Sequence, residues 1–412
     1  MNIIPLIVLA AVFLLIIIRK VGRINFKVWQ IMSLGGFAVL LTASISLGDA
    51  FKAIKWDVMF FLFGMFVVGQ ALEDSGYLQS VSYKFFRKAK NFDALLLFII
   101  LGAGVSSALL MNDTLAIVGT PIMLLLARQH KVNAKMLLLA LAFSITIGSV
   151  MSPIGNPQNL LIASHMESPF ITFFAYLAIP TIINLFVLFL LLKIFFKKHF
   201  TKKELVHEPK EIKNPELALV AKISLAIVVL LILAKIILYF FKTDFNMVLI
   251  ALLGAAPILL YRLFAKNFHI VRKLDWHTLI FFAAMFVLMA SVWDTGFFQS
   301  VITNLRLEIE SLPIILLIST FLSQLISNVP LVALYLPLLQ HIGITTAGLI
   351  ALAVGSTIAG NMTIMGAASN IIIFAKAERR ENVSVTFWDF FKIGMPLTII
   401  NLLVYYAFII LT

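Results

Sequence analysis

Long apolar runs are the feature that most constrains this chain. They lie near 3–18, 28–48, 58–72, 94–127, 136–165, 170–196, 217–241, 245–264, 276–292, 312–342, 347–375 and 388–411. Most approach the ~20 residues that a helix needs to cross the hydrocarbon core of a bilayer. Composition agrees, because 62% of the residues are hydrophobic and only 12% are charged. The sequence therefore predicts an all-α polytopic membrane protein and excludes a soluble enzyme.

Two of these runs, 94–127 and 312–342, are too long for a single crossing. Polar residues interrupt each run in the middle, as Asn112-Asp113-Thr114 and as Ser327-Asn328-Val329-Pro330. Broken backbone at membrane depth is tolerated only where it is buried in protein or lines a cavity. We interpret each long run as a re-entrant hairpin, which leaves ten membrane crossings.

The basic residues gather in alternate loops. These loops span 19–27, 73–93, 128–135, 197–216, 262–275 and 376–387. The loops between them hold only Lys52, Lys55, Lys242 and Arg306. Because basic residues accumulate on the cytoplasmic side of a membrane, this asymmetry predicts that both termini lie outside. It also explains the net charge of +13 without a nucleic-acid partner.

The two halves of the chain resemble each other. Residues 56–81 and 276–301 are identical at ten of 26 positions when they are aligned at an offset of 220, and the matches include Trp56 with Trp276 and Asp74 with Asp294. Each half holds five crossings and one hairpin, and five is odd, so the second half is predicted to be inverted. The expected units are repeats 1–196 and 217–412, joined by a cytoplasmic linker, 197–216. Inverted repeats with discontinuous helices are typical of secondary transporters.

A second pair of polar interruptions occurs in the later runs of the two halves. Gly155-Asn156-Pro157-Gln158-Asn159 matches Gly366-Ala367-Ala368-Ser369-Asn370. Proline lacks a backbone donor and glycine permits unusual backbone, so both segments are predicted to break a helix. Broken helices free carbonyl groups that can bind a cation and helix N-termini that favour an anion. The predicted substrate-binding residues are Asn112, Asp113, Thr114, Asn156, Asn159, Ser327, Asn328, Ser369 and Asn370.

Asp113 is the only acid deep inside an apolar run. A carboxylate at the bilayer centre costs about 2.5–3.5 kcal/mol on insertion scales and is a functional candidate by default. We expect it to take part in proton or cation binding. The alternative is that it holds the hairpin tip by accepting backbone N–H bonds. The four motifs contain no lysine or arginine. An anionic substrate would therefore be held by helix dipoles and co-bound cations, and a neutral solute would also fit.

Other functional classes find little support in the sequence. There is no His-Glu-x-x-His motif, no paired intramembrane aspartate set and no cysteine, so an enzyme is not expected. No cofactor is expected beyond a coupling ion. An ion channel remains an alternative, but a pseudo-twofold axis in the membrane plane is a device of transporters.

These motifs resemble those of the ion transporter superfamily over essentially the whole chain. The superfamily includes the citrate-transporter-like domain, the divalent anion:sodium symporters and the arsenical pump membrane proteins. Asn112-Asp113 followed by Thr120-Pro121 is similar to the arsenical-pump pattern. The resemblance implies one cation site at Ser107, Asn112 and Gly155, and another at Ser323, Asn328 and Gly366. It also implies a homodimer and an elevator-like movement of the hairpin domain.

The sequence thus predicts a secondary active transporter in the inner (plasma) membrane. Its substrate would be a small anion or oxyanion, such as a dicarboxylate, a citrate-like compound or a metalloid species, coupled to Na⁺ or H⁺. A Na⁺/H⁺ antiporter of the same superfamily is the alternative within this class.

Overall fold

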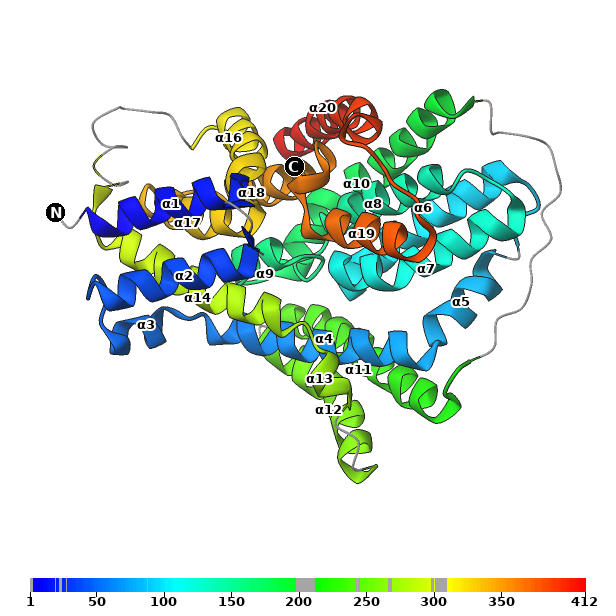
Figure 1. The fold of residues 1–412 in the computed structure, drawn as a ribbon, viewed down its shortest axis with the longest axis horizontal. Coiled ribbons are helices and arrows are strands. Elements are labelled where there is room, and N and C mark those ends of the chain that lie inside the picture. Colours follow the sequence, from blue (N-terminus) through cyan, green and yellow to red (C-terminus); the bar gives the residue numbers. More distant parts are fainter. Residues whose placement is uncertain are drawn as a thin grey trace.

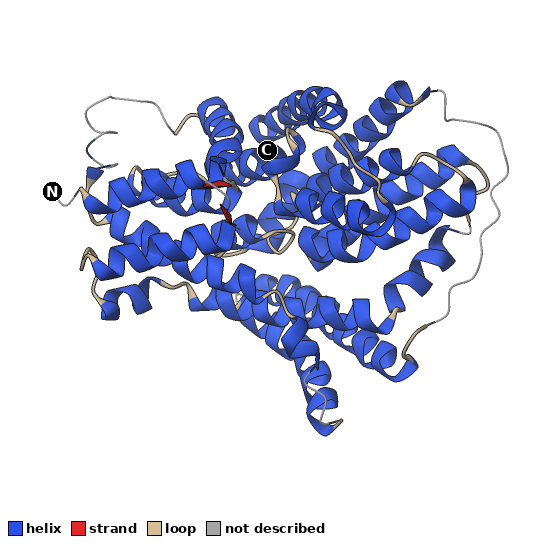
Figure 2. Ribbon diagram, viewed as in Figure 1, coloured by secondary structure: helices blue, strands red, loops and turns tan. Residues whose placement is uncertain are grey.

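The structure is a computed structural model of the full chain. It describes residues 3–18, 20–21, 24–26, 28–86, 88–197, 212–241, 243, 245–265, 269–297, 300 and 310–412. Most of the predicted linker, residues 198–211, lies outside the described residues. Helices dominate the fold (Figure 2). The described strands are β1 (Lys20–Val21) and β2 (Ile24–Asn25), which pair antiparallel with Lys20 opposite Asn25.

The helices follow the order of the apolar runs. The first half contains α1 (Ile4–Ile18), α2 (Val28–Leu41), α3 (Leu47–Ala53), α4 (Trp56–Ser75), α5 (Tyr77–Phe86), α6 (Phe92–Leu110), α7 (Asn112–His130), α8 (Ala134–Ser149), α9 (Pro157–Ala163) and α10 (Pro169–Phe195). The second half contains α11 (Pro215–Phe240), α12 (Met247–Phe264), α13 (His269–Lys273), α14 (Trp276–Trp293), α16 (Leu312–Ile326), α17 (Asn328–His341), α18 (Thr346–Ile358), the 3₁₀ turns η2 (Ala359–Asn361) and η3 (Ile364–Gly366), α19 (Ala368–Glu381) and α20 (Phe387–Leu411).

Seven of the described helices are long and apolar enough to cross a membrane. They are α4, α6, α10, α11, α12, α14 and α20. Shorter apolar helices occur within α1, α2, α8 and α16 and across α18 and η2. This inventory confirms the prediction of an all-helical, polytopic membrane protein.

Each over-long run folds as two helices that meet at a single residue. Met111 joins α6 to α7 with φ +64°, and Ser327 joins α16 to α17 with φ +73°. Residues other than glycine seldom adopt positive φ, and such strain is concentrated at functional sites. The polar interruptions in the sequence therefore mark the tips of the two helix pairs correctly.

The later runs of each half are also broken where the sequence predicts. In the first half α8 ends at Ser149 and α9 begins at Pro157, with Asn156 as its N-cap. In the second half α18 ends at Ile358, and the chain passes through two 3₁₀ turns before α19 begins at Ala368. Proline in the first turn of a helix loses no hydrogen bond, because that N–H has no partner within the helix.

The helices pack in two neighbourhoods that α4, α9 and α17 help to connect. In Figure 1, α1, α2 and α14 lie side by side, and α6, α7, α8 and α10 form the group at the right. The helices α4 and α14 run antiparallel, since Asp74 near the end of α4 forms a 3.1 Å ion pair with Lys273, three residues before α14. This arrangement places the starts of the two helices at opposite ends of the pair.

Small residues bring two pairs of helices into close contact. Gly64 of α4 packs against Ala251 of α12, where an added Cβ would lie 2.6 Å from the Ala251 carbonyl oxygen. Gly36 of α2 packs against Ala284 of α14 in the same way, and an added Cβ there would lie 3.0 Å from the Ala284 carbonyl oxygen. Ala284 stands 220 residues after Gly64. Small residues at helix interfaces are typical of membrane proteins, because packing rather than the hydrophobic effect joins helices in lipid.

Candidate functional site

A central cavity of about 550 Å³ lies where the two helix-pair tips meet the breaks. Its walls include Asn112 and Asp113 of one tip and Ser327 and Asn328 of the other. The starts of α9 and α19 complete this part of the wall, through Pro157, Gln158, Ala367 and Ala368. Four segments far apart in the sequence, each singled out by its polar residues, therefore converge on one space.

The first tip is tied to the first break. The Asn112 N–H donates a 2.9 Å hydrogen bond to the Gly155 carbonyl, so the structure brings these two predicted residues together. Asp113 lines the central cavity and also a smaller neighbouring one, which Thr114 shares. Ser107 lies one turn back along α6, is fully buried and donates a 2.6 Å bond to the Ile145 carbonyl. Thr114 and Ser107 therefore lie near the tip but outside the wall of the central cavity.

Several buried oxygens at the tips and in the second break have no hydrogen-bond partner within the described part of the chain, and two of their residues, Asn112 and Asn328, line the central cavity. These oxygens are Asn112 Oδ1, Ser323 Oγ, Asn328 Oδ1, Ser369 Oγ and Asn370 Oδ1. Each belongs to a residue that the sequence predicted to bind substrate or cation. Buried polar groups are nearly always hydrogen-bonded, and one without a partner calls for an explanation such as an unseen ligand. Neutral oxygens of this kind are suited to hard cations.

The asparagines of the first break take part in a buried hydrogen-bond network. Asn156 Oδ1 accepts a 2.8 Å bond from the Asn159 N–H, which caps α9. Asn159 Nδ2 donates to the carbonyls of Ser149 and Ser152, at 3.1 and 3.0 Å. Both asparagines are fully buried in this network and lie behind the cavity wall.

The second break is held by a side chain that sequence reasoning did not identify. Gln324 Nε2 donates a 2.7 Å bond to the Ala359 carbonyl, and Gln324 Oε1 accepts a 2.8 Å bond from Thr363. Asn370 Nδ2 donates to the Gly360 carbonyl at 2.7 Å, much as Asn159 does in the first half. Gly366 lies beside this group, since an added Cβ there would stand 3.0 Å from Gln324 Oε1. Gln324 also lines the central cavity.

The start of α14 supplies polar groups that the sequence analysis did not identify, and they line the central cavity. Asp275 and His277 both line the central cavity, and the His277 ring lies 4.8 Å from the Trp29 ring. Asp275 also caps α14, because its Oδ1 accepts a 3.1 Å bond from the Thr278 N–H. The available signal was that Asp275 and His277 flank Trp276, the first matched position of the repeat.

The charged groups of the central cavity are acidic. Asp113 and Asp275 line it, and no lysine or arginine does so among the residues that the structure describes. Within the same residues, no group of three or more histidines and carboxylates is placed to hold a metal ion. The cavity therefore combines two carboxylates, amide and hydroxyl oxygens, and the N-terminal ends of α7, α17 and α19.

Comparison with known proteins places this arrangement in a family. A family model described as citrate transporter matches residues 12–348. The chain is 25% identical to an uncharacterized transporter of Mycobacterium tuberculosis over 98% of this chain and 96% of that protein. It is also 25% identical to the human P protein, over 96% of this chain and 58% of the longer relative.

A solved structure gives the same fold. The YdaH transporter of Alcanivorax borkumensis matches 98% of this chain and 96% of its own, with a TM-score of 0.56 and 14% sequence identity. At that identity the likeness establishes a common architecture.

Proposed function

The chain belongs to the citrate transporter family, and we propose that it is a secondary active transporter of a small anion or oxyanion coupled to Na⁺ or H⁺. The observation that carries the proposal is the convergence of both helix-pair tips on one cavity with unsatisfied buried oxygens. The name of the matched family supports a citrate-like carboxylate as the substrate.

The architecture proposed is a pair of inverted repeats, 1–196 and 217–412, each with five crossings and a re-entrant hairpin. The helix contacts support this architecture, because several contacts between the two halves have a matching contact between the corresponding helices. The helix α4 packs on α12 as α14 packs on α2, and α7 packs on α19 as α17 packs on α9. The antiparallel course of α4 and α14, whose sequences match, is what inversion requires.

The helix ends at the cavity support an anion as the substrate. The N-termini of α7, α17 and α19 border it, and each carries a partial positive charge from the helix dipole. The carboxylates of Asp113 and Asp275 oppose an anion unless protons or cations neutralise them. Neutralisation by a coupling ion therefore favours substrate binding, which is the thermodynamic requirement for coupled transport.

Two cation sites are proposed, one around each tip. Asn112 and Gly155 already lie within hydrogen-bond contact, with Ser107 one turn away on α6. Ser323 and Asn328 are placed similarly on α16 and α17, and both carry an unsatisfied oxygen, while Gly366 packs beside Gln324, the residue after Ser323. Asp113 is the ionisable group of the first site.

Transport is proposed to proceed by an elevator-like movement in a homodimer that spans the plasma membrane with both termini outside. The helix pairs and broken helices form the moving body, and α1, α2, α4, α11, α12 and α14 form the fixed body. The close glycine and alanine contacts of α4 with α12 and of α2 with α14 support this division, since they lie wholly within the fixed body.

A Na⁺/H⁺ antiporter is the second candidate function. The specific observation that favours it is the pair of carboxylates in a cavity whose described lining holds no lysine or arginine. In this alternative Asp113 would exchange a proton for a cation, and the helix N-termini would serve only structural purposes.

The test is flux in proteoliposomes that contain the purified full chain. Labelled citrate, succinate, arsenite, sulfate and phosphate are offered separately under an imposed Na⁺ or pH gradient. Saturable, gradient-driven accumulation of one anion is the expected result. A Na⁺-driven pH change without any anion would establish the antiporter instead, and single-channel currents would establish a channel.

A further inference from the structure

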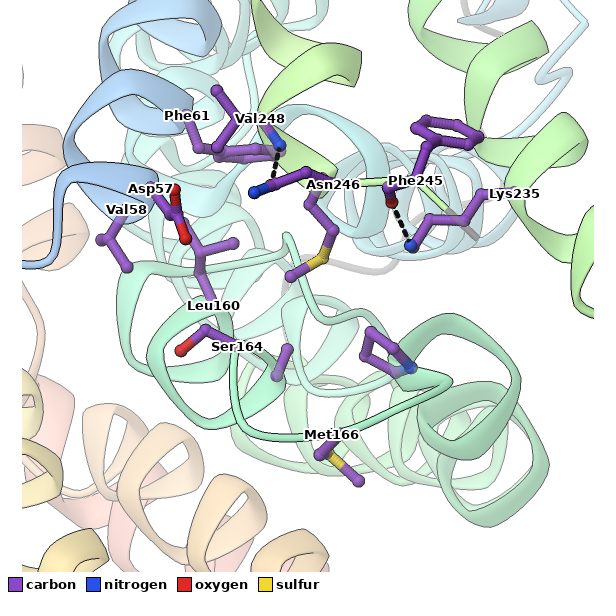
Figure 3. Close-up of a pocket in the computed structure, with 13 residues that line it drawn as sticks. Asp57, Val58, Phe61, Leu160, Ser164, Met166, Lys235, Phe245, Asn246 and Val248 are labelled. Atoms are coloured by element: carbon purple, nitrogen blue, oxygen red, sulfur yellow. Dashed lines mark hydrogen bonds between the residues drawn. The ribbon is translucent and has the colours of Figure 1, made fainter. Parts of the chain in front are cut away.

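A second cavity of about 320 Å³ lies between the start of α4 and the start of α12 (Figure 3). Asp57 of α4 and Lys235 of α11 stand on opposite sides of it, and Ser164, just after α9, also lines it. Lys235 is only 6% exposed. Its Nζ donates a 2.6 Å bond to the Phe245 carbonyl and lies 5.2 Å from the centre of the Phe245 ring. A buried lysine at a cavity wall is costly unless its charge is compensated or used.

The second cavity is built from the counterparts of residues in the central cavity. Asp57, Val58 and Phe61 precede His277, Thr278 and Phe281 by 220 positions, and each set lines its own cavity. Because α4 and α14 run antiparallel, the starts of the two helices lie at opposite ends of the pair. The two cavities therefore open toward opposite ends of corresponding helices.

The two cavities differ in charge. The central cavity has Asp113 and Asp275, whereas the charged residues at the second are Lys235 and Asp57. Asp57 is exposed, so water and salt screen its charge, while the buried charge of Lys235 is screened much less. The N-terminal end of α12, which also borders the cavity, adds a partial positive charge. Lys235 and the start of α12 therefore both favour an anion inside the second cavity, whereas Glu167, which shares an adjoining small cavity with Lys235, lies outside its lining.

We propose that the second cavity is an anion-attracting vestibule on the membrane face opposite the central cavity, and that Lys235 is the residue that selects for anions there. The ligands it favours are small carboxylates and oxyanions. A positive cleft with low-dielectric walls raises the local concentration of an anion and its association rate. The inference rests on the proposed transport of an anion, but the vestibule can be tested without transport.

The experiment uses the full chain, which has no cysteine, with the single substitution Ser164→Cys. Two membrane-impermeant methanethiosulfonates are compared at pH 8, where an ordinary histidine is neutral: the anionic sulfonatoethyl and the cationic trimethylammonioethyl reagents. The ratio of their reaction rates is divided by the same ratio for a free thiol in solution. With Lys235 present, this normalised ratio is expected to exceed one. Lys235→Gln keeps a donor for the Phe245 carbonyl but removes the charge, and is expected to lower the ratio at least about threefold.

Two variants serve as matched controls. Lys235→Arg retains the charge and should retain the ratio, and Lys222→Gln removes an exposed charge from the same helix and should leave it unchanged. Should Lys235→Gln fail to fold, a salt titration of the Ser164→Cys chain replaces it, and the ratio should fall toward one. The proposal is overturned if the normalised ratio is one or less with Lys235 in place. It is also overturned if neither Lys235→Gln nor salt changes the ratio. If the labelling results support the vestibule but the flux assay shows no anion transport, only the proposed function is contradicted.

Discussion

The Thr357 hydroxyl donates a 3.1 Å hydrogen bond to Asn159 Oδ1, so that α18 of one half is joined to α9 of the other. The same hydroxyl oxygen accepts a 3.2 Å bond from Asn156 Nδ2. Thr357 is 1% exposed and stands in the last turn of α18, directly before the second break. The two broken helices therefore share one buried hydroxyl group.

Thr357→Val is expected to destabilise the fold, because valine keeps the shape of threonine and leaves the amides of Asn156 and Asn159 without this partner. A buried polar group without a partner costs about 1–3 kcal/mol. The temperature of unfolding in detergent should fall by several degrees. Thr357→Ser retains the hydroxyl and should unfold close to the original temperature. Equal unfolding temperatures for the valine and serine variants would contradict the bridging role.

The polar interruptions were enough to locate both tips and both breaks from the sequence. Met111 and Ser327 sit at the tips because the polar residues that follow each of them begin a new helix, α7 or α17, and such local effects leave a local signal. Gln324 left no such signal, and the signal for Asp275 and His277 was only their position beside Trp276, because all three reach the cavity through packing between distant helices. For the same reason, the sequence does not reveal that Asn156 and Asn159 lie behind the cavity wall.

Asp113→Asn is expected to abolish coupling while the protein still inserts and folds. The amide keeps the size of the carboxylate but cannot bind a proton reversibly or contribute a full charge to a cation site. Gradient-driven uptake in proteoliposomes should fall at least about tenfold, a change of 1.4 kcal/mol or more. If uptake by the original chain depends on pH, the asparagine variant should lose that dependence.

Asp294→Asn is the control for this prediction. Asp294 follows the end of α14 and lies away from the central cavity. The Asp294→Asn variant should take up substrate at the original rate. Coupled uptake by Asp113→Asn at the original rate would show that the carboxylate only holds the tip.

Asn328→Ala is expected to weaken cation binding at the second tip. The unsatisfied Oδ1 of Asn328 is the ligand that the substitution removes, and alanine still continues α17. Where Na⁺ is the coupling ion, its half-saturating concentration should rise about tenfold, the effect of losing about 1.4 kcal/mol. Thr42→Ala, at an exposed position directly after α2, should leave the Na⁺ dependence unchanged. An unaltered dependence in both variants would remove Asn328 from the cation site.

The proposed orientation predicts which side of the membrane each loop faces. Lys90 lies between α5 and α6, and Glu167 lies between α9 and α10; both are exposed. In intact cells, an impermeant maleimide should label Glu167→Cys but not Lys90→Cys. After permeabilisation both should react. Labelling of both positions in intact cells would be incompatible with the orientation proposed for the first half.

An ion pair links the two bodies proposed for the elevator. Lys376 Nζ of α19 lies 3.1 Å from Glu73 Oε1 of α4 and donates a 2.8 Å bond to the Ile117 carbonyl of α7. A movement of α7 and α19 past α4 must break the contact with Glu73. The pair therefore stabilises the conformation described here, and a partly exposed pair of this kind is worth about 1 kcal/mol.

Glu73→Gln is expected to shift the population away from this conformation by up to about fivefold, the equivalent of about 1 kcal/mol. Labelling of Thr278→Cys in the central cavity should slow, and labelling of Ser164→Cys in the second cavity should accelerate. Asp93→Asn is the matched control, since Asp93 of α6 pairs with Lys193 of α10, and these two helices pack on each other. Identical labelling rates in Glu73→Gln and Asp93→Asn would mean that the Glu73 contact does not change during the transport cycle.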